Sequence, residues 1–252
     1  MLQLVGTERI EELRRRVARI ERGGAAGEAA PVLPFGVDAI DRHLPGGGLA
    51  LGALHEVSGV GPDEEDGAVP ASFVAGLVAR LDPARTILWC QSGADDLYGP
   101  GLAARGLDPA RLIVARTRTL TDLLWAMEEG LRNRALAAVV GELAALPGPA
   151  SRRLQLAAEN SGVTAIALCR VRLRGDAARA PNAAVTRWNV SPVPSLPAAG
   201  EPGLGRPRWR LDLWRARGAA PADWIVEACD ATGHVTLSAA LGDGTARQPK
   251  FA

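Results

Sequence analysis

Short apolar runs separated by amphipathic stretches recur along most of the chain. Three of the runs, at 86–90, 136–140 and 163–169, are almost continuously apolar, and a further strand is predicted at 54–57, Leu-His-Glu-Val. Such runs are typical of strands that are covered on both faces of a sheet. Strands alternating with helices predict βαβ units and a mostly parallel sheet flanked by helices, which is an α/β fold. A fifth strand is predicted at 112–115, and helices are predicted at 37–44, 70–81, 101–105, 120–134 and 151–160.

The pattern changes after about residue 182, where helical periodicity disappears. The remaining apolar runs predict consecutive strands in hairpins, which would add antiparallel strands to the C-terminal side of the sheet. In the second of them, Trp209, Leu211 and Leu213 alternate with polar residues, so we expect the tryptophan side to face the core. These four runs span residues 184–190, 209–214, 223–229 and 234–239.

The N-terminal stretch predicts a helix that is separated from the rest of the chain. Residues 3–22 place apolar side chains on one stripe, and a linker rich in Gly, Ala and Pro follows at 23–34. The stripe either packs back on its own domain or docks on a neighbouring subunit or partner. We therefore divide the chain into an oligomerisation or partner helix (1–22), the linker (23–34), a core domain (35–240) and a polar tail expected to be disordered (241–252). The stripe consists of Ile10, Leu13, Val17 and Ile20.

Composition limits the classes of protein to which the chain can belong. The chain has 252 residues, of which 47% are hydrophobic, and a formal net charge of +1, so any basic binding site must be local. Three distant cysteines without a CxxC pair argue against a disulfide framework or zinc site and favour a reducing compartment, with Cys90 and Cys169 expected in the core. No uninterrupted apolar run reaches 18 residues and no signal peptide is visible, so we expect a cytoplasmic protein without a membrane partner.

Residues 54–81 have the layout of a phosphate-binding loop, namely a strand, a glycine-rich turn and a helix. A working loop of this kind needs a Lys for the β- and γ-phosphates and a Ser or Thr hydroxyl for Mg²⁺. No Lys follows Gly59, Gly61 or Gly67, and four acidic residues occupy positions 63–66. Each acid would repel a triphosphate by roughly 1–4 kcal/mol at contact range. The sequence thus predicts a degenerate nucleotide loop, with no cofactor and no ATPase activity.

The entry to this region resembles the RecA core family. Residues 33–61 contain a turn, a short Asp-containing helix, a Gly-Gly-Gly loop and a Glu-Val-x-Gly strand end. This pattern extends from residue 1 to about residue 239. More narrowly, the chain is similar to the ImuA proteins. The segments that support it are Thr-Ile-Leu-Trp-Cys-Gln at 86–91, and residues 101–112, 123–130 and 209–218 with Trp224 after them. The cell-division inhibitor SulA is a shorter relative and a weaker match.

The resemblance implies a RecA-like core with a tethered N-terminal helix and a role in the SOS response. ImuA proteins support translesion synthesis and mutagenesis together with an ImuB-type partner and an error-prone replicative-type polymerase. We therefore expect a non-catalytic adaptor that binds itself, RecA or the ImuB-type partner. Two alternatives stay open: a recombinase-like protein that binds single-stranded DNA, with or without ATP, and a SulA-like cell-division inhibitor.

The resemblance also directs attention to carboxylates at strand ends. A RecA-type ATPase uses a Glu after its loop region and an Asp that holds Mg²⁺ at the end of a strand. The matching positions here carry Asp95 or Asp96, and Gly141 followed by Glu142. Without the loop Lys, we expect these acids to be solvated loop residues and not metal ligands.

Arginines form two candidate patches. The first, after the strand at 163–169, lies in the loop that contacts single-stranded DNA in the RecA family; a solvated loop is the alternative. The second is interleaved with Trp209 and Trp214, and its later members could line a subunit interface. The three histidines are scattered singly and are expected to be structural. The first patch consists of Arg170, Arg172, Arg174 and Arg179, and the second of Arg206, Arg208, Arg210, Arg215 and Arg217.

Overall fold

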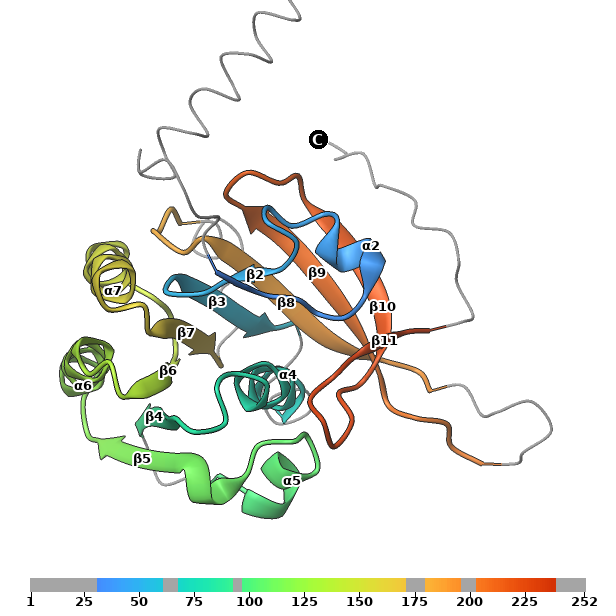
Figure 1. Cartoon of the computed structure of the whole chain (residues 1–252), viewed down its shortest axis with the longest axis horizontal. Coiled ribbons are helices and arrows are strands. Elements are labelled where there is room, and N and C mark those ends of the chain that lie inside the picture. Colours follow the sequence, from blue (N-terminus) through green and yellow to red (C-terminus); the bar gives the residue numbers. More distant parts are fainter. Residues whose placement is uncertain (1–30, 61–67, 93–96, 171–179, 196–202, 239–252) are drawn as a thin grey trace, which may run out of the picture. The chain divides into compact units, whose positions relative to one another are not determined.

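The computed structural model describes residues 31–60, 68–92, 97–170, 180–195 and 203–238. Within these residues a nine-stranded sheet forms the centre of the fold, in the order β11-β10-β9-β8-β3-β7-β6-β4-β5 (Figure 1). Its strands are β3 (Leu54–Gly59), β4 (Thr86–Ser92), β5 (Leu112–Thr117), β6 (Leu136–Leu143), β7 (Thr164–Cys169), β8 (Thr186–Val193), β9 (Arg208–Ala216), β10 (Ala222–Glu227) and β11 (Thr236–Leu237).

The sheet has a parallel part and an antiparallel part. β3 to β8 pair in parallel wherever they are neighbours. The pairs β8–β9, β9–β10 and β10–β11 are antiparallel. The predicted α/β class, with a mostly parallel sheet and antiparallel strands toward the C-terminus, is therefore confirmed. The expected direction of the strand near 184–190 is wrong, because β8 runs parallel to β3 and only its other neighbour, β9, is antiparallel.

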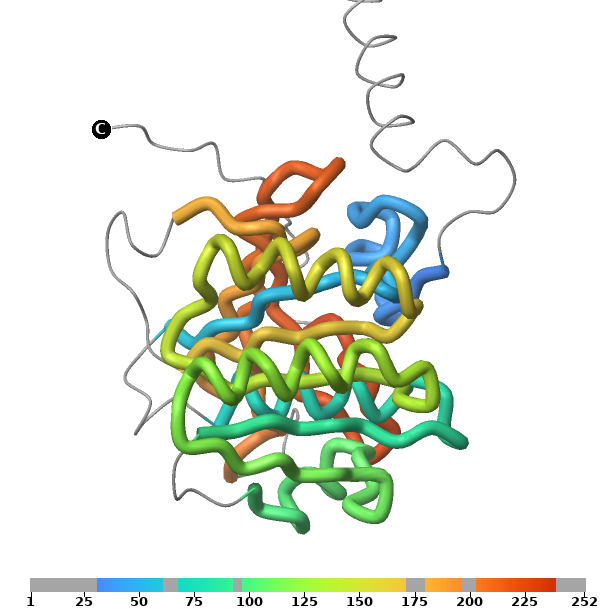
Figure 2. Tube along the Cα trace, turned by 90° about the vertical axis from the view of Figure 1, so that its left-hand side faces the viewer, coloured from blue at the N-terminus to red at the C-terminus, as the bar shows by residue number. Residues whose placement is uncertain are grey.

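Helices cover the two faces of the sheet. Helix α4 (Ala68–Ala79) packs on one face against β3, β7 and β8. Helices α6 (Leu120–Arg132) and α7 (Gly148–Ser161) lie side by side over the other face (Figure 2). The aromatic rings of Phe35, Phe73 and Trp188 pack together on the α4 side. Helix α5 (Gly99–Ala103) and the 3-10 helix η1 (Pro109–Arg111) precede the edge strand β5.

The local signals of α6 explain why it forms where the sequence predicts it. The Thr119 hydroxyl accepts a hydrogen bond from the Asp122 amide at 3.1 Å and caps the first turn. The buried positions recur at helical spacing, while the outward positions are polar or exposed. This matches the amphipathic pattern seen in the sequence. The buried residues are Leu123, Leu124, Met127, Gly130 and Leu131.

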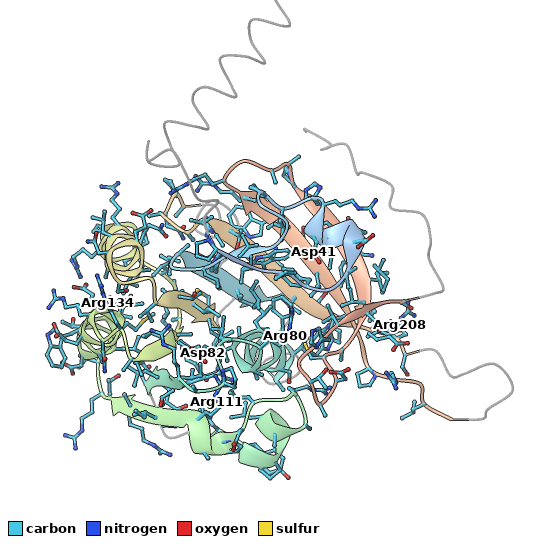
Figure 3. The ribbon with its side chains drawn as sticks, in the orientation of Figure 1. Asp41, Arg80, Asp82, Arg111, Arg134 and Arg208 are labelled. Carbon is cyan, nitrogen blue, oxygen red and sulfur yellow. The ribbon has the colours of Figure 1, made fainter. Side chains whose placement is uncertain are left out.

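The start of the described chain differs from the expectation. Residues 23–34 were predicted to be a linker, but Val32–Leu33 form strand β1 and pair with β2 (Leu49–Ala50) in a separate two-stranded sheet. The helix predicted at 37–44 is shorter, α2 at Asp38–Asp41. Asp41 at the end of α2 (labelled in Figure 3) accepts hydrogen bonds from the amides of Phe35 and Gly36 and so closes the turn that precedes the helix. The predicted helix at 3–22 and the predicted tail at 241–252 lie outside the described residues.

Within the part of the chain that the structure describes, we find no helix long and apolar enough to span a membrane.

Candidate functional site at the carboxyl ends of the parallel strands

The carboxyl ends of β3, β7, β6 and β4 meet at one edge of the sheet because these neighbouring strands run in parallel. Ligands of open α/β sheets bind at this edge. The strands end at Gly59, Cys169, Leu143 and Ser92. Polar side chains near these ends therefore form the candidate functional site.

Glu142, near the end of β6, is the central side chain of this edge. It is 8% exposed. The indole Nε1 of Trp89 donates a hydrogen bond to its Oε1 at 2.6 Å. On its other oxygen, the Nε and Nη2 atoms of Arg170 lie at 2.8 Å and 2.7 Å. Both oxygens of the carboxylate are thus engaged by protein donors.

This arrangement changes two expectations. Glu142 was predicted to be a solvated loop acid, and that is wrong, because the strand continues to Leu143 and keeps Glu142 inside. Arg170 was predicted as a DNA contact, and the structure pairs its guanidinium with a carboxylate. A charge that is already offset by a buried partner adds less to the attraction of phosphate groups than a solvated one.

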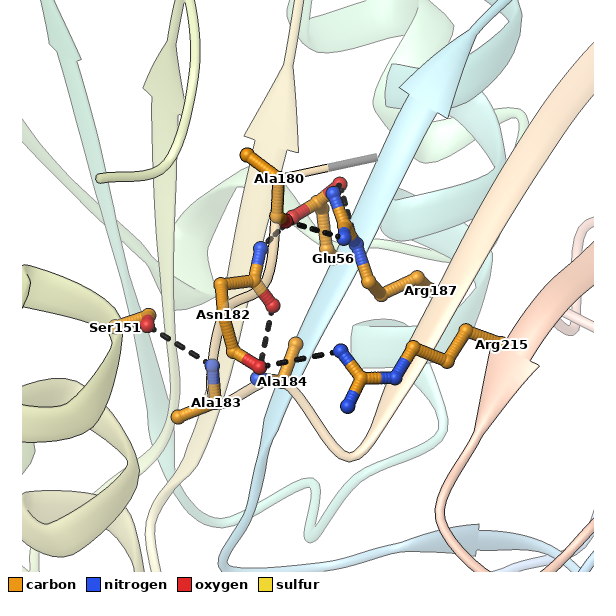
Figure 4. A network of polar contacts seen from close by, with 8 residues as sticks. All are labelled: Glu56, Ser151, Ala180, Asn182, Ala183, Ala184, Arg187 and Arg215. Carbon is orange, nitrogen blue, oxygen red and sulfur yellow. Dashed lines mark hydrogen bonds and ion pairs between the residues drawn. The ribbon is translucent and has the colours of Figure 1, made fainter. Parts of the chain in front are cut away.

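A second buried ion pair lies between β3 and β8 (Figure 4). The Nε and Nη2 atoms of Arg187 donate to Oε1 of Glu56 at 3.0 Å and 2.8 Å. The two side chains are only 5% and 7% exposed. The side-chain Nδ2 of Asn182 donates to Oε2, the other oxygen of Glu56. Nη1 of Arg187 donates to the Ala180 carbonyl at 2.9 Å.

The pair is held from further sides. The Arg187 guanidinium lies 4.0 Å from the centroid of the Trp214 ring, within the range of a cation–π contact. Ser151 on α7 accepts a hydrogen bond from the Ala183 amide at 2.9 Å. Nη1 of Arg215 reaches the Asn182 carbonyl at 3.4 Å. Residues 180–184 are therefore fixed to β3, to α7 and to β9 at once.

The two ion pairs have one feature in common: each fixes one end of segment 171–179. Arg170, bound to Glu142, comes directly before the segment, and Ala180 and Asn182, bound to the Glu56–Arg187 pair, come directly after it. The predicted DNA contacts Arg172, Arg174 and Arg179 belong to this segment and lie outside the described residues. The chain on both sides of them is held by buried carboxylates of β6 and β3.

The described first turn of α4 offers a phosphate fewer donors than a typical helix N-terminus. A phosphate at a helix N-terminus is bound by free backbone N–H groups of the first turn. The first turn here is Ala68, Val69, Pro70 and Ala71, which has no side-chain donor, and Pro70 has no N–H. Gly59 ends β3, and a Cβ added to it would lie 3.3 Å from Cγ of Pro70. The other two glycines of the predicted loop, Gly61 and Gly67, lie outside the described residues, as do the acids at 63–66 and at 95 and 96.

The second arginine patch is largely paired. Arg206 lies 3.6 Å from Glu227, and Arg210 lies 3.4 Å from Asp223. Arg208 is 7% exposed and donates to the Pro194 carbonyl at 3.2 Å. As predicted from the alternation, Trp209 is buried in the core. The Trp214 ring, by contrast, packs against the Arg187 guanidinium.

Burial governs the remaining titratable side chains of interest. It lowers the pKa of His55 to about 4, against a smaller opposite effect of the hydrogen bond to the Ala50 carbonyl. All three cysteines are buried, as predicted for two of them, and burial raises the pKa of each thiol to about 12. These are Cys90, Cys169 and Cys229. No group of three or more His, Cys, Asp or Glu side chains able to hold a metal ion occurs among the described residues.

Sequence reasoning missed Trp89, Glu56, Asn182 and Arg187 as members of this site. A signal exists for Glu56, since an acid inside an apolar strand needs a buried partner. Its partner could not be found from the sequence, because Arg187 is 131 positions away.

Comparison with known proteins agrees with the resemblance to the ImuA proteins. No family model matches the chain. Two curated relatives, each named Protein ImuA, come from Caulobacter vibrioides strains NA1000 / CB15N and ATCC 19089 / CIP 103742 / CB 15. Each is 42% identical over 211 residues, which covers 81% of this chain and 86% of the relative.

Proposed function

The chain belongs to the ImuA family, and from that premise we propose that it is a non-catalytic adaptor in DNA-damage-induced translesion synthesis. Membership of the family ties it to the ImuA/ImuB mutagenesis system. In our proposal it associates with itself through the N-terminal stripe and binds RecA, the ImuB-type partner or both. It thereby raises the local concentration of the error-prone polymerase at damaged DNA.

The observation that carries the non-catalytic part is the state of Glu142. This carboxylate is the one described acid at the carboxyl edge, next to α4, that could hold Mg²⁺ for a nucleotide. Trp89 and Arg170 already bind both of its oxygens. A metal ion would have to displace a guanidinium at 2.7 Å and leave that cation half-buried without its partner.

The start of α4 supports the same proposal. The described first turn offers a phosphate neither a side-chain donor nor the N–H of residue 70. The preceding loop also has no Lys, so no cation is available there to bind the terminal phosphates in place of the missing donors. A sheet edge with these features suits protein contacts better than phosphoryl transfer.

The first experiment measures nucleotide binding and turnover by the full chain. We expect no binding of ATP and Mg²⁺ in calorimetry and no phosphate release above a buffer control. Glu142→Gln serves as the matched variant, because it removes the charge and keeps the shape. Turnover by the wild type that is abolished in Glu142→Gln would refute the non-catalytic proposal.

The second experiment tests the adaptor proposal. Light scattering of the full chain and of a variant lacking residues 1–22 is compared with and without RecA. We expect the full chain to form the larger species and the shortened chain to lose it. Equal masses for both proteins, alone and with RecA, would contradict a role for the N-terminal stripe.

A second function, weak binding of single-stranded DNA, is favoured by the fixed ends of segment 171–179. Because the described residues on either side, Arg170 and Ala180, are already held in place, less of the chain has to be ordered on binding, and this lowers the entropic cost. Arg172→Ala with Arg174→Ala should weaken binding and reduce its salt dependence, because fewer counterions are released. Unchanged affinity and salt slope in that double variant would exclude this function.

A further inference from the structure

Arg208 is the first residue of β9 and is almost completely enclosed, with 7% of its surface exposed (labelled in Figure 3). Its Nη1 donates a hydrogen bond to the Pro194 carbonyl at 3.2 Å. Its Nε is buried and has no hydrogen-bond partner, and no other buried side-chain nitrogen or oxygen of the described residues is in this state. Buried polar groups are normally hydrogen-bonded, and buried charges are normally paired. Arg208 therefore has an unused donor at a protected place.

The neighbouring arginines of the same strand region have anionic partners. Arg210 lies 3.4 Å from Asp223 of β10, and Arg206, just before β9, lies 3.6 Å from Oε2 of Glu227. Glu227 is opposite Arg208 in the register of β9 and β10, yet its ion pair is with Arg206. Among the described residues, no carboxylate forms an ion pair with Arg208, so its charge is the one in this group that is not offset.

Another arginine of this protein shows which group fits such a guanidinium. In Arg187, Nη1 donates to the Ala180 carbonyl, while Nε and Nη2 both donate to one carboxylate oxygen of Glu56. Arg208 has the same kind of backbone contact at Nη1 but no acceptor at Nε. The paired N–H groups of a guanidinium match the geometry of a carboxylate and bind it strongly. A carboxylate is therefore the group that would complete the surroundings of Arg208.

We propose that Arg208 is a binding site for one carboxylate group that comes from outside the described residues. A single carboxylate suits the site better than a nucleic-acid backbone, because Asp223 and Glu227 on the adjacent strand repel a polyanion. A sugar-phosphate chain is also too bulky to reach a side chain that is so little exposed. Nε is out of contact with water, so binding includes a rotation of the side chain that brings Nε to its exposed part.

The test follows the Nε–H proton of Arg208 by NMR in the full, nitrogen-labelled chain. Sodium acetate is the probe, and sodium chloride at equal ionic strength is the control. We expect a saturable downfield shift with a dissociation constant on the order of 10 mM, as for a few charge-assisted hydrogen bonds formed in competition with water. This titration needs no substitution, so it decides the question even if a variant fails to fold.

Two peptides distinguish the sources of the carboxylate. Acetyl-Gly-Glu-Gly-amide presents the side chain of a partner protein, and the same peptide with Gln in place of Glu is its control. Binding of the Glu peptide and not of the Gln peptide identifies an acidic side chain of a partner as the ligand. Binding of acetate without binding of the Glu peptide identifies a small free carboxylate. Either outcome supports the site.

Two variants give a second readout, the melting temperature in acetate minus that in chloride. At about ten times the dissociation constant, acetate should raise the melting temperature of the wild type by about 3–6 °C. Arg208→Lys keeps the charge but lacks the planar pair of N–H groups, so it should lose this difference. Arg210→Lys is the matched control on the same strand and should keep it, because Arg210 is 43% exposed and already pairs with Asp223.

Three results would overturn the proposal. The first is a signal of Arg208 that acetate does not shift in a saturable way, and the second is inorganic phosphate binding as tightly as acetate. The third is an Nε–H signal that moves upfield, without any acetate, in Glu227→Gln or in Glu201→Gln, a residue outside the described ones. An acid of the chain itself would then occupy the site. None of these results bears on ATP turnover or on the deletion of residues 1–22, so this proposal and the adaptor proposal can fail separately.

Discussion

Replacing Arg187 with Met tests the energetic role of the buried pair with Glu56. The change keeps much of the aliphatic side chain and removes the guanidinium, whose Nε and Nη2 atoms lie within 3.0 Å of Oε1 of Glu56. It also removes the hydrogen bond to the Ala180 carbonyl and the contact with Trp214. The carboxylate of Glu56 is then left buried, with Asn182 as its remaining described side-chain donor.

The expected cost is large because the side chains of both partners are more than nine-tenths buried. Breaking such a pair by removing one partner destabilises a protein by about 3–5 kcal/mol. With a urea dependence of about 2–3 kcal/mol per M, the unfolding midpoint should fall by roughly 1–2.5 M. Urea unfolding followed by tryptophan fluorescence measures this shift directly.

Replacing both partners gives the opposite expectation. In Glu56→Leu with Arg187→Met no buried charge is left alone, so the double variant should be at least about 2 kcal/mol more stable than Arg187→Met. Arg42→Met is the matched control, since the Arg42–Asp38 pair is 80% and 83% exposed and should contribute little. A loss below about 1 kcal/mol in Arg187→Met, or no recovery in the double variant, would refute the reasoning.

Three further predictions concern stability and reactivity. The pKa of His55 is about 4 in the folded chain, against 6.5 for a solvated histidine, so unfolding binds a proton between these values and stability should fall by about 3 kcal/mol from pH 6.5 to pH 4. His55→Gln should show a flatter loss in urea titrations over this window; an identical slope would contradict the assignment. A Cβ on Gly106 (φ +87°) would lie 2.8 Å from the Gly233 amide nitrogen, whereas Gly47 (φ +85°) has nothing within 4 Å. Gly47→Ala should therefore cost about 1–2 kcal/mol and Gly106→Ala a further 1–3 kcal/mol, and equal melting temperatures would exclude the clash. The thiols of Cys90, Cys169 and Cys229 should resist iodoacetamide at pH 8 and react only after unfolding, because burial raises the pKa of all three to about 12. Mass spectrometry measures the labelling, and labelling of the folded chain would contradict this prediction.

The sequence predicted most elements of the parallel sheet because their signals are local. Apolar runs marked β4, β6 and β7, the strand–turn–helix layout marked β3, and helical periodicity marked α6, each within a few residues of the observed bounds. The elements missed completely were β1, β2 and the 3-10 helix η1, which have two or three residues each and are too short to show any periodicity. The division of the chain at residues 22, 34 and 240 stays a prediction.

What the sequence could not supply is pairing between distant residues. The parallel direction of β8 depends on the connection from Arg170 to Val185, which returns the chain to the amino end of β3, where the Val185 amide bonds to the Leu54 carbonyl. The site shows the same limit. Glu142 was noticed as a candidate, but its environment depends on Trp89, which lies 53 positions earlier.

The two ion pairs, one buried on both sides and one with a half-buried arginine, are better explained by position than by stability. A buried pair returns little of what its desolvation costs, and apolar replacements of similar volume are often as stable. Their common feature is where they act: Glu142 binds Arg170 just before segment 171–179, and Glu56 binds Arg187 and Asn182 just after it. An apolar contact could fill the same space without fixing the orientation of the chain, since it is not directional. Charged hydrogen bonds fix both distance and direction. The pairs therefore determine where the arginine-rich segment leaves the sheet. The double variant at positions 56 and 187 separates that effect from stability, because it should recover stability without the charged hydrogen bonds.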